Sequence, residues 1–350
     1  MTQIVVSGVT DFAALGRRWR ELETRAEPSF FQSWTWMGCL AEERFTDPVL
    51  VEAREDGRAV ALGLFNRRRS RMGQILYLGE AGQPSLDRPY IEYNGLLTVA
   101  GREATLTRAC LASLRRPTVM SGIDDSTLAA AQAAFGVVRV EQSRRAPYAD
   151  LAAIRAAGDD ILAHLGANTR QQIRRSDRAY AESGTLSIER AATVEQAHAF
   201  LESMVPLHQA TWQARGAPGC FAEPFFGRFH HALIDRGMKR GEIDLFRVAA
   251  GPVLVGILYN FRFRGRSLAY QSGFAYPGPE SRRKPGMTSH RLAMDYLLKD
   301  GVDCYDFLAG DDRYKRVLSD GATDLHWIEA GPRVSVVGLR SLLDLWRRRI

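Results

Sequence analysis

The sequence predicts an α/β protein built from two similar units in tandem, each a mixed, mainly antiparallel sheet flanked by helices. Three observations support this prediction. The chain has 350 residues, which suits two domains of ordinary size. Its composition, 45% hydrophobic and 25% charged, is that of a globular protein with a sizeable core. A helical region followed by three strand-like runs occurs twice, at positions about 190 residues apart.

The first unit is expected to span residues 1–150. It begins with a short strand and two helices, and turn signals at Asp56-Gly57 and Met72-Gly73 then separate three strands. The expected helices are 11–25, 33–43, 102–115 and 126–134, and the expected strands are 4–6, 49–54, 59–66, 74–78, 118–121 and 137–142. Pro147 and an Ala-rich patch within residues 144–158 indicate the junction to the second unit.

The second unit, residues 151–350, is expected to repeat this order. Ala250-Gly251 and Gly265 stand where the first unit has its hairpin turns. The expected helices are 159–165, 168–183, 194–215 and 221–238, and the expected strands are 186–190, 243–249, 253–263 and 267–274. Hairpin turns recur in many proteins, but the order of the flanking helices favours a duplication of one α/β unit.

Composition also narrows the class of protein. No apolar run approaches the roughly 20 residues that a membrane span requires, and residues 1–12 lack the features of an export signal. The four cysteines are far apart and form no Cys-x-x-Cys pair, so we expect a reduced, cytoplasmic protein without structural zinc. The dispersed histidines indicate no other metal site. A formal net charge of +7 favours an anionic partner, whether a nucleotide cofactor, RNA or acidic lipid.

The most informative stretch is residues 281–318. A basic loop closed by Pro285-Gly286 leads into a helix, which Gly301 ends before a short apolar strand over residues 302–308. A glycine-bearing basic loop at a helix N-terminus offers unpaired N–H groups and the positive end of the helix dipole, which suit a phosphate or pyrophosphate. An ordinary loop, helix and strand would show the same pattern.

Two further segments are basic. Arg170, Arg174 and Arg178 repeat every four residues and therefore line one face of the helix over residues 168–183. That face is either solvated or a surface for phosphates. The tail, residues 334–350, has the pattern of a basic amphipathic helix, which would either touch an acidic membrane surface or pack against the second domain.

Several short motifs occur in an order that resembles a known family. They are Phe31-Gln32-Ser33 with Trp36, Asn168-Thr169-Arg170-Gln171-Gln172-Ile173-Arg174-Arg175, Leu207-His208 with Trp212, Arg215 and Gly216, Pro285-Gly286, and Asp306-Phe307 with Gly310 and Tyr314-Lys315. With the order of helices and strands, they resemble the GNAT acyltransferases. Two such units in tandem resemble the Fem-type aminoacyl transferases and the CelD-like group. The resemblance implies a degenerate GNAT-like first unit and an active site in the second.

The resemblance also implies transfer of an acyl group to an amine. The donor would be acyl-CoA, such as acetyl-CoA, or aminoacyl-tRNA in the Fem-type branch. Such an enzyme must position both partners, stabilise an oxyanion and accept a proton, with no covalent intermediate. The residues that would bind the donor by this resemblance are Arg283, Lys284, Gly286, Met287, Thr288 and Ser289. This loop has one glycine, and Thr288 stands where the GNAT signature has its second small residue.

The expected catalytic residues are Tyr314, Lys315, His208 and Asp306. Tyr314 is suited to protonate a leaving thiolate, and Lys315 to neutralise a phosphate or the oxyanion. His208 is suited to take a proton near neutral pH, or it packs on Trp212 as an ordinary helix histidine. Asp306 lies in an apolar strand, where a carboxylate needs a partner. The expected substrate-binding residues are Trp212, Arg215, Asp311, Arg170 and Arg174, with a helix cap as the alternative role of Asp311.

The favoured function is N-acyl transfer from acyl-CoA to an amine on a small molecule, sugar or lipid precursor. Two alternatives remain open. The helix with Arg170 and Arg174 favours a Fem-type transferase that uses aminoacyl-tRNA. The single glycine of the donor loop favours a non-catalytic protein that binds an anionic polymer or scaffolds polysaccharide biosynthesis.

Overall fold

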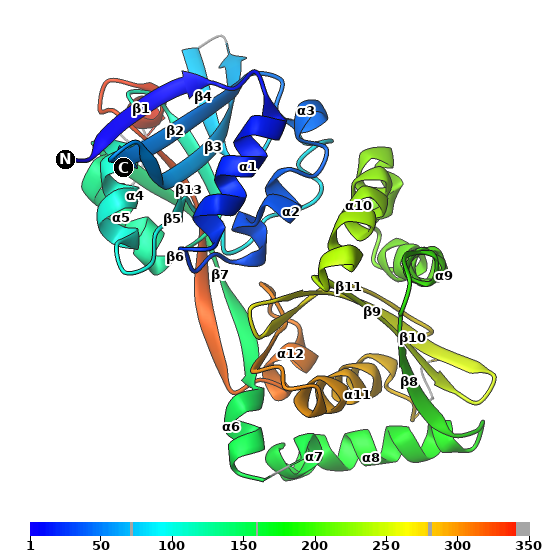
Figure 1. Ribbon diagram of the computed structural model, residues 1–350. Coiled ribbons are helices and arrows are strands. Elements are labelled where there is room, and N and C mark those ends of the chain that lie inside the picture. The colour runs from blue at the N-terminus through cyan, green and yellow to red at the C-terminus, as the bar shows by residue number, and fades with distance from the viewer. Residues whose placement is uncertain (71–72, 159, 279–281, 341–350) are drawn as a thin grey trace, which may run out of the picture. The chain divides into compact units, whose positions relative to one another are not determined.

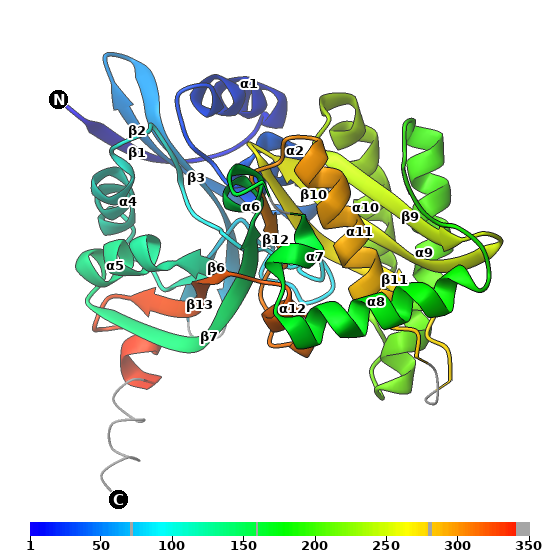
Figure 2. The ribbon, with the colours of Figure 1, turned by 90° about the horizontal axis from the view of Figure 1, so that it is seen from below.

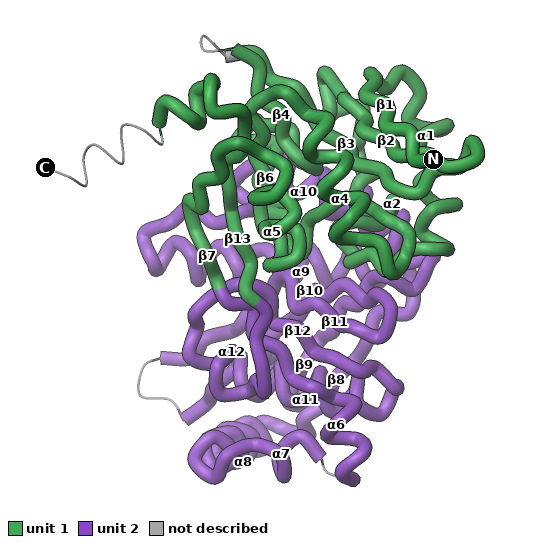
Figure 3. Tube along the Cα trace, turned by 90° about the vertical axis from the view of Figure 1, so that its left-hand side faces the viewer, with its two compact units in different colours: residues 1–144, 324–350 green, residues 145–323 purple. Residues whose placement is uncertain are grey.

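The computed structural model describes residues 1–70, 73–158, 160–278 and 282–340 (Figure 1). The described chain forms two compact units: unit 1 comprises residues 1–144 and 324–340, and unit 2 comprises residues 145–323 (Figure 3). Residues 324–340, which the sequence analysis assigned to the second domain, therefore cluster with unit 1. Strands β7 (Val137–Asp150) and β13 (Gly321–Gly331) each contribute residues to both units.

Unit 1 is a mainly antiparallel sheet with short helices. Its other elements are β1 (Gln3–Gly8), α1 (Phe12–Glu23), η1 (Phe30–Gln32), α2 (Trp34–Met37), α3 (Ala41–Arg44), β2 (Pro48–Glu55), β3 (Arg58–Ser70), β4 (Gly73–Leu78), β5 (Leu97–Thr98), α4 (Glu103–Ala112), β6 (Thr118–Asp124) and α5 (Asp125–Ala134). The strand order is β1-β2-β3-β4-β6-β13-β7, with β6 parallel to β4. The apolar core lies between this sheet and helices α4 and α5, where Leu106, Cys110 and Leu111 are buried.

Unit 2 repeats this plan at larger scale. Its other elements are α6 (Leu151–Ala156), α7 (Ile161–His164), α8 (Ala167–Ala181), β8 (Leu186–Arg190), α9 (Val194–Ala214), η2 (Cys220–Ala222), α10 (Pro224–Gly237), η3 (Met238–Arg240), β9 (Ile243–Ala250), β10 (Val253–Phe263), β11 (Arg266–Phe274), α11 (Pro285–Lys299), β12 (Cys304–Asp306) and α12 (Arg313–Val317). The strand order is β7-β12-β11-β10-β9-β8. Helices α9 and α10 cover one face of the sheet, and α8 and α11 cover the other (Figure 1).

From β1 in unit 1 and from β8 in unit 2, which follows α6–α8, the two units have the same order of elements, which confirms the predicted tandem arrangement. Each has a first strand, helices, an antiparallel three-strand meander, a helix and then a strand parallel to the third strand of the meander. The sequence analysis did not predict that a strand following one unit would pair in the sheet of the other. The end of β7 pairs with β12 in unit 2, and β13 pairs with β6 in unit 1, so each sheet is completed by the strand that follows the other unit in sequence.

Tight turns explain why the meanders were recognisable in the sequence. Asp56 and Gly57 both have positive φ, of 49° and 77°, as do Arg264 and Gly265, with 46° and 75°. Two consecutive positive φ values are the geometry of a type I′ hairpin turn, which matches the twist of the flanking strands. Residue 72 of the other predicted turn, Met72-Gly73, lies outside the described residues.

Two predicted elements differ from the structure. The single helix expected over residues 33–43 is broken into α2 and α3, with Leu40 at a φ of 46°. The buried guanidinium of Arg44 donates hydrogen bonds to the carbonyls of Trp36 and Cys39, so the break leaves these carbonyls with a partner. The strand expected over residues 302–308 is shorter, because Leu308 has a φ of 58° that ends the extended backbone.

The C-terminal tail is described only as far as residue 340. Residues 336–340 are helical, but Trp346 and Arg347, Arg348 and Arg349, the basic end of the predicted amphipathic helix, lie outside the described residues. Over the described ranges, no helix combines the length and the apolar character needed to cross a membrane.

Candidate active site

Strands β11 and β12 separate at the centre of the candidate site. They pair in parallel only from Arg266 and Cys304 to Leu268 and Asp306, whereas β11 continues to Phe274. β12 also pairs with β7, and beyond Asp306 this pairing continues, with the Phe307 amide donating to the Pro147 carbonyl at 2.9 Å. The second half of β11 is therefore not paired with β12, and the two strands part toward the N-terminus of α11.

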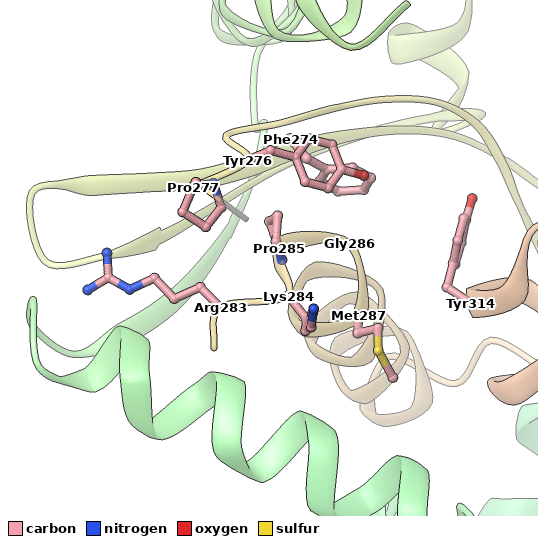
Figure 4. A pocket seen from close by; sticks show the side chains of 10 residues that line it. Phe274, Tyr276, Pro277, Arg283, Lys284, Pro285, Gly286, Met287 and Tyr314 are labelled. Atoms are coloured by element: carbon pink, nitrogen blue, oxygen red, sulfur yellow. The ribbon is translucent and has the colours of Figure 1, made fainter. Parts of the chain in front are cut away.

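A pocket of about 290 Å³ lies at this opening (Figure 4). It is lined by Phe274, Tyr276, Pro277, Gly278, Arg283, Lys284, Pro285, Gly286, Met287 and Tyr314. Four of the predicted donor-binding residues and one predicted catalytic residue therefore meet in one pocket. The sequence analysis missed Phe274, the last residue of β11, and Tyr276, which follows this strand on the way to the donor loop.

The first turn of α11 presents two backbone amides to this pocket. Pro285, at the first helical position, has no N–H group. The Lys284 amide donates to Ser176 Oγ at 2.8 Å, and the Thr288 amide donates to the Lys284 carbonyl at 3.0 Å. The amides of Gly286 and Met287 remain, since the first turn of a helix has no internal acceptors for them. A helix N-terminus of this kind attracts anions.

The donor loop is anchored on α8, which lies beside α11 (Figure 2). The Arg283 guanidinium donates to the Ala179 carbonyl at 3.1 Å and to Ser183 Oγ at 2.6 Å, and it lies 5.0 Å from the ring centroid of Tyr180. Arg283 stands on the opposite side of the pocket from Tyr314 (Figure 4). Its charge is therefore directed at α8, whereas Lys284 is the exposed cation at the helix start.

Thr288 and Ser289 lie away from the pocket. Both are fully buried, and Thr288 Oγ1 bonds to Ser176 Oγ and Asp177 Oδ1, each at 2.9 Å. Ser289 Oγ is buried without a hydrogen-bond partner among the described residues. Thr288 therefore lies in the contact between α11 and α8. Neither the Thr288 nor the Ser289 side chain lines the pocket.

Tyr314 is held by stacking on a buried histidine that the sequence analysis missed. Its ring lies 4.9 Å from the ring of His290, with an angle of 15° between the planes. Asn260 donates to the Tyr305 hydroxyl at 3.4 Å, and that hydroxyl lies 2.8 Å from His290 Nδ1, so the imidazole is fixed from behind. Burial, assisted by the charge of Lys315, lowers the pKa of His290 to about 3, so the ring is neutral.

The hydroxyl of Tyr314 is kept protonated by its surroundings. Burial first, and then the nearby carboxylate of Asp312, raise the pKa of Tyr314, against the opposing charge of Arg215. A protonated phenol in the wall of the pocket can donate a hydrogen bond to a group on which negative charge develops.

Arg215 connects this pocket to the end of α9. Its guanidinium lowers the pKa of both Tyr276 and Tyr314 against larger opposing effects, which places it near both phenols. It also lies 5.5 Å from the ring centroid of Trp212. The three predicted residues Arg215, Trp212 and His208 therefore form a second group at the C-terminal end of α9.

His208 is buried and neutral. Its Nδ1 lies 3.2 Å from the Ser272 carbonyl, and because a carbonyl only accepts, Nδ1 carries the proton. The lone pair is then on Nε2, which has no hydrogen-bond partner among the described residues. Burial lowers the pKa of His208. The side chain packs on Phe221 and Trp212, with ring centroids 5.3 and 6.0 Å away.

Lys315, Asp306 and Asp311 do not line the pocket. Lys315 Nζ donates to the carbonyls of Leu308 and Ala309 at 3.2 and 3.0 Å, which holds the turn after β12. Asp306 is fully buried, pairs with Arg266 at 2.7 Å and accepts from the Leu308 amide at 2.8 Å. Asp311 is exposed and pairs with Arg316.

Arg170 and Arg174 lie elsewhere, in a groove of about 520 Å³ along α8. The groove is lined by Ala167, Arg170, Gln171, Arg174, Asp177 and Arg178. Within the described ranges, no group of three or more His, Cys, Asp and Glu side chains could hold a metal ion.

Comparison with known proteins agrees with this architecture. Residues 167–316 match the family model of an acetyltransferase (GNAT) domain. No curated protein matches the chain. Among solved structures, FemX is similar at 11% identity and a TM-score of 0.57, over 92% of this chain and 96% of that one.

Two further structures are similar over nearly their whole length. A C-terminal DUF2156 domain from Agrobacterium fabrum has 13% identity and a TM-score of 0.56, over 96% of this chain and 95% of that one. L-PGS from Bacillus licheniformis has 9% identity and a TM-score of 0.53, over 95% and 97%. At these identities the likeness concerns the fold, which it supports across both units.

Proposed function

Because residues 167–316 match the model of an acetyltransferase (GNAT) domain, we propose that the chain transfers an acyl group from an acyl-CoA-type thioester to an amine. The amine would attack directly, without a covalent intermediate. The observation that carries the proposal is the pocket at the open end of β11 and β12, where the first turn of α11 and Tyr314 face one space. A small molecule, a sugar or a lipid precursor would supply the amine.

The pocket residues fit the donor in two parts. The Gly286 and Met287 amides and the Lys284 side chain would bind phosphate at the helix N-terminus. Phe274, Met287 and Tyr276 offer apolar surface to the thioester arm. When bound, the donor supplies an activated carbonyl; the protein positions it, excludes water and donates hydrogen bonds.

Tyr314 is the proposed general acid. Its protonated phenol would donate to the sulfur as negative charge develops there, and the stacked His290 ring fixes its orientation. The proposed acceptor side is the end of α9, because the charge of Arg215 acts on the Tyr314 phenol and His208 has a neutral imidazole whose Nε2 has no hydrogen-bond partner among the described residues. His208 is the candidate to accept the proton of the amine. Lys315 and Asp306 would act through the shape of the loop that carries Tyr314.

Changing Gly286 tests donor binding. We expect Gly286→Glu to raise the Kd for CoA by at least about tenfold, because a carboxylate at the helix start repels phosphate. The variant should fold, since an acidic residue in the first turn stabilises a helix. In a thermal-shift titration with CoA and acetyl-CoA, the wild type should show a dose-dependent rise in Tm that the variant lacks.

Gly286→Ala is the matched control. A Cβ at this position would meet the Phe274 ring at 3.4 Å, an ordinary contact, so the alanine variant should bind nearly as well as the wild type. An equal rise in Tm for Gly286→Glu and the wild type would contradict the proposed donor site.

A second candidate function uses aminoacyl-tRNA as the donor, and the arginines along α8 favour it. A non-catalytic role in polysaccharide biosynthesis is the third. Salt-sensitive tRNA binding without any CoA-dependent rise in Tm would favour the second candidate, and the absence of both would favour the third.

A further inference from the structure

Helix α8 carries four arginines, none of which the proposed chemistry uses, and three of them share one face. Arg170, Arg174 and Arg178, here called the arginine stripe, line the groove of about 520 Å³ on the outer side of the helix. Ile173, Ser176 and Tyr180 form the buried side. None of the stripe arginines forms an ion pair with a carboxylate in the described parts of the chain, and Arg170 instead donates to the Ala163 carbonyl at 3.2 Å.

Several other arginines of unit 2, in contrast, pair with nearby carboxylates, as in Arg155 with Asp303, Arg190 with Asp244, Arg240 with Glu242, Arg262 with Asp300, and Arg266 with Asp306. Asp177 is the one carboxylate among the described lining residues of the groove, and it pairs with Arg291 from α11 at 2.7 Å. Like charges four residues apart destabilise a helix, so the stripe lowers stability unless an anionic partner offsets the repulsion.

The stripe is held in a fixed position relative to the donor pocket. Ser176 of α8 accepts from the Lys284 amide, and Arg283 binds the C-terminal end of α8 through Ala179 and Ser183. A partner bound along α8 would therefore lie beside the N-terminus of α11, which lines the donor pocket. The two sites belong to the same unit and share the loop that joins them.

Among the described residues, few groups of the pocket can bind phosphate. The first turn of α11 has two available amides, Gly286 and Met287, because Pro285 has no N–H and the amides of Lys284 and Thr288 are used. Lys284 adds one charge, while Arg283 is turned toward α8. This set suits a single phosphodiester better than the pyrophosphate and additional ribose phosphate of CoA. A phosphopantetheine arm on a carrier protein has such a single phosphodiester.

We propose that the preferred acyl donor is the phosphopantetheine thioester of an acidic carrier protein, with an acidic helix of that protein bound along the arginine stripe. This inference rests on the proposed acyl transfer. Arginines four residues apart are separated by about 6 Å along the helix axis, and carboxylates four residues apart on a partner helix have the same spacing. Each guanidinium can bind a carboxylate in a bidentate manner. None of the described residues that line the groove is aromatic, so RNA bases would have no ring there on which to stack.

The test compares two neighbouring arginines of the same helix. Arg174→Glu reverses a charge of the stripe, and the substituted carboxylate is four residues from both Arg170 and Arg178, which supports the helix. Arg175→Glu makes the same charge change at the next residue, which does not line the groove. Binding of a fluorescently labelled holo acyl carrier protein to the full-length chain is measured by anisotropy at several salt concentrations.

We expect Arg174→Glu to raise the Kd for the carrier protein by at least about tenfold, and Arg175→Glu to stay within about twofold to threefold of the wild type. In activity assays, the ratio of kcat/KM for acetyl-carrier protein to that for acetyl-pantetheine should fall by a similar factor in Arg174→Glu. The binding of the wild type should weaken as salt rises.

Three results would overturn the inference. They are carrier binding that Arg174→Glu leaves intact, equal loss in both variants, and tight tRNA binding that only Arg174→Glu abolishes. Absence of transfer from every thioester, with carrier binding still dependent on Arg174, would instead contradict the proposed acyl transfer and leave the docking surface in place.

Discussion

Replacing Tyr314 with phenylalanine is expected to lower kcat for acyl transfer by about a hundredfold or more, with KM for the donor nearly unchanged. The substitution removes the hydroxyl that we propose donates to the leaving sulfur. It keeps the ring that stacks on His290 at 4.9 Å, so the pocket wall should be preserved. The rate of thiol release is measured with acetyl-CoA and a panel of primary amines.

The donor's leaving group provides an internal check on this role. A thioester of an acidic aryl thiol needs little protonation of the sulfur, so the defect of Tyr314→Phe should shrink with such a donor. Tyr276→Phe, which removes the other phenol of the pocket, is the matched control and should reduce kcat only a few fold. A Tyr314→Phe enzyme with nearly wild-type kcat would rule out the proposed general acid.

Local sequence signals were sufficient to predict the repeated part of the fold. Turn residues with positive φ, such as Gly57 and Gly265, separate the strands of both meanders, and apolar periodicity marks the helices around them. The crossing of β7 and β13 between units was not predictable in this way. The strand that pairs with β6 comes from residues 325–330, and no local pattern specifies a partner so distant in sequence.

The sequence indicated those residues of the candidate site that belong to local motifs, but not those whose role depends on tertiary packing. The loop chemistry and the order of the motifs indicated four residues that lie together in the lining of the pocket: Lys284, Gly286, Met287 and Tyr314. His290 was missed because its role depends on stacking and on Tyr305, which follows from tertiary packing.

The charged residues at β12 show the opposite difficulty. Asp306 and Lys315 have side chains of types that are common in catalysis. In the structure, Asp306 pairs with Arg266, and Lys315 donates to two loop carbonyls. A sequence shows that a buried charge needs a partner without showing which residue supplies it.

Two buried histidines are expected to make unit 2 sensitive to acid. Burial lowers the pKa of His230 and of His290 to about 3 each, from an ordinary value of 6.5. Above pH 6.5 both rings are neutral in the folded and unfolded states. As the pH falls from 6.5 toward 3, the unfolded chain takes up protons that the folded chain does not, so stability present at neutral pH is lost.

The loss should be measurable as a slope. Each such histidine contributes about 1.4 kcal/mol per pH unit to the decline of the free energy of unfolding, or about 3 kcal/mol between pH 6.5 and pH 4. His230→Phe removes one of the two, in a shell formed by Phe226, Phe229, Tyr259 and Tyr270, so its unfolding free energy should fall less steeply in this range.

Urea unfolding from pH 7 to pH 4 measures the difference between the two slopes, which cancels the carboxyl groups common to both proteins. Phe226→Leu serves as the control, because it removes packing from the same shell without a titratable group and should lower stability equally at each pH. If the free energy of unfolding falls equally steeply with pH in His230→Phe and the wild type, His230 takes up its proton over the same pH range in the folded and unfolded protein. The buried aromatic shell would then accommodate its charge.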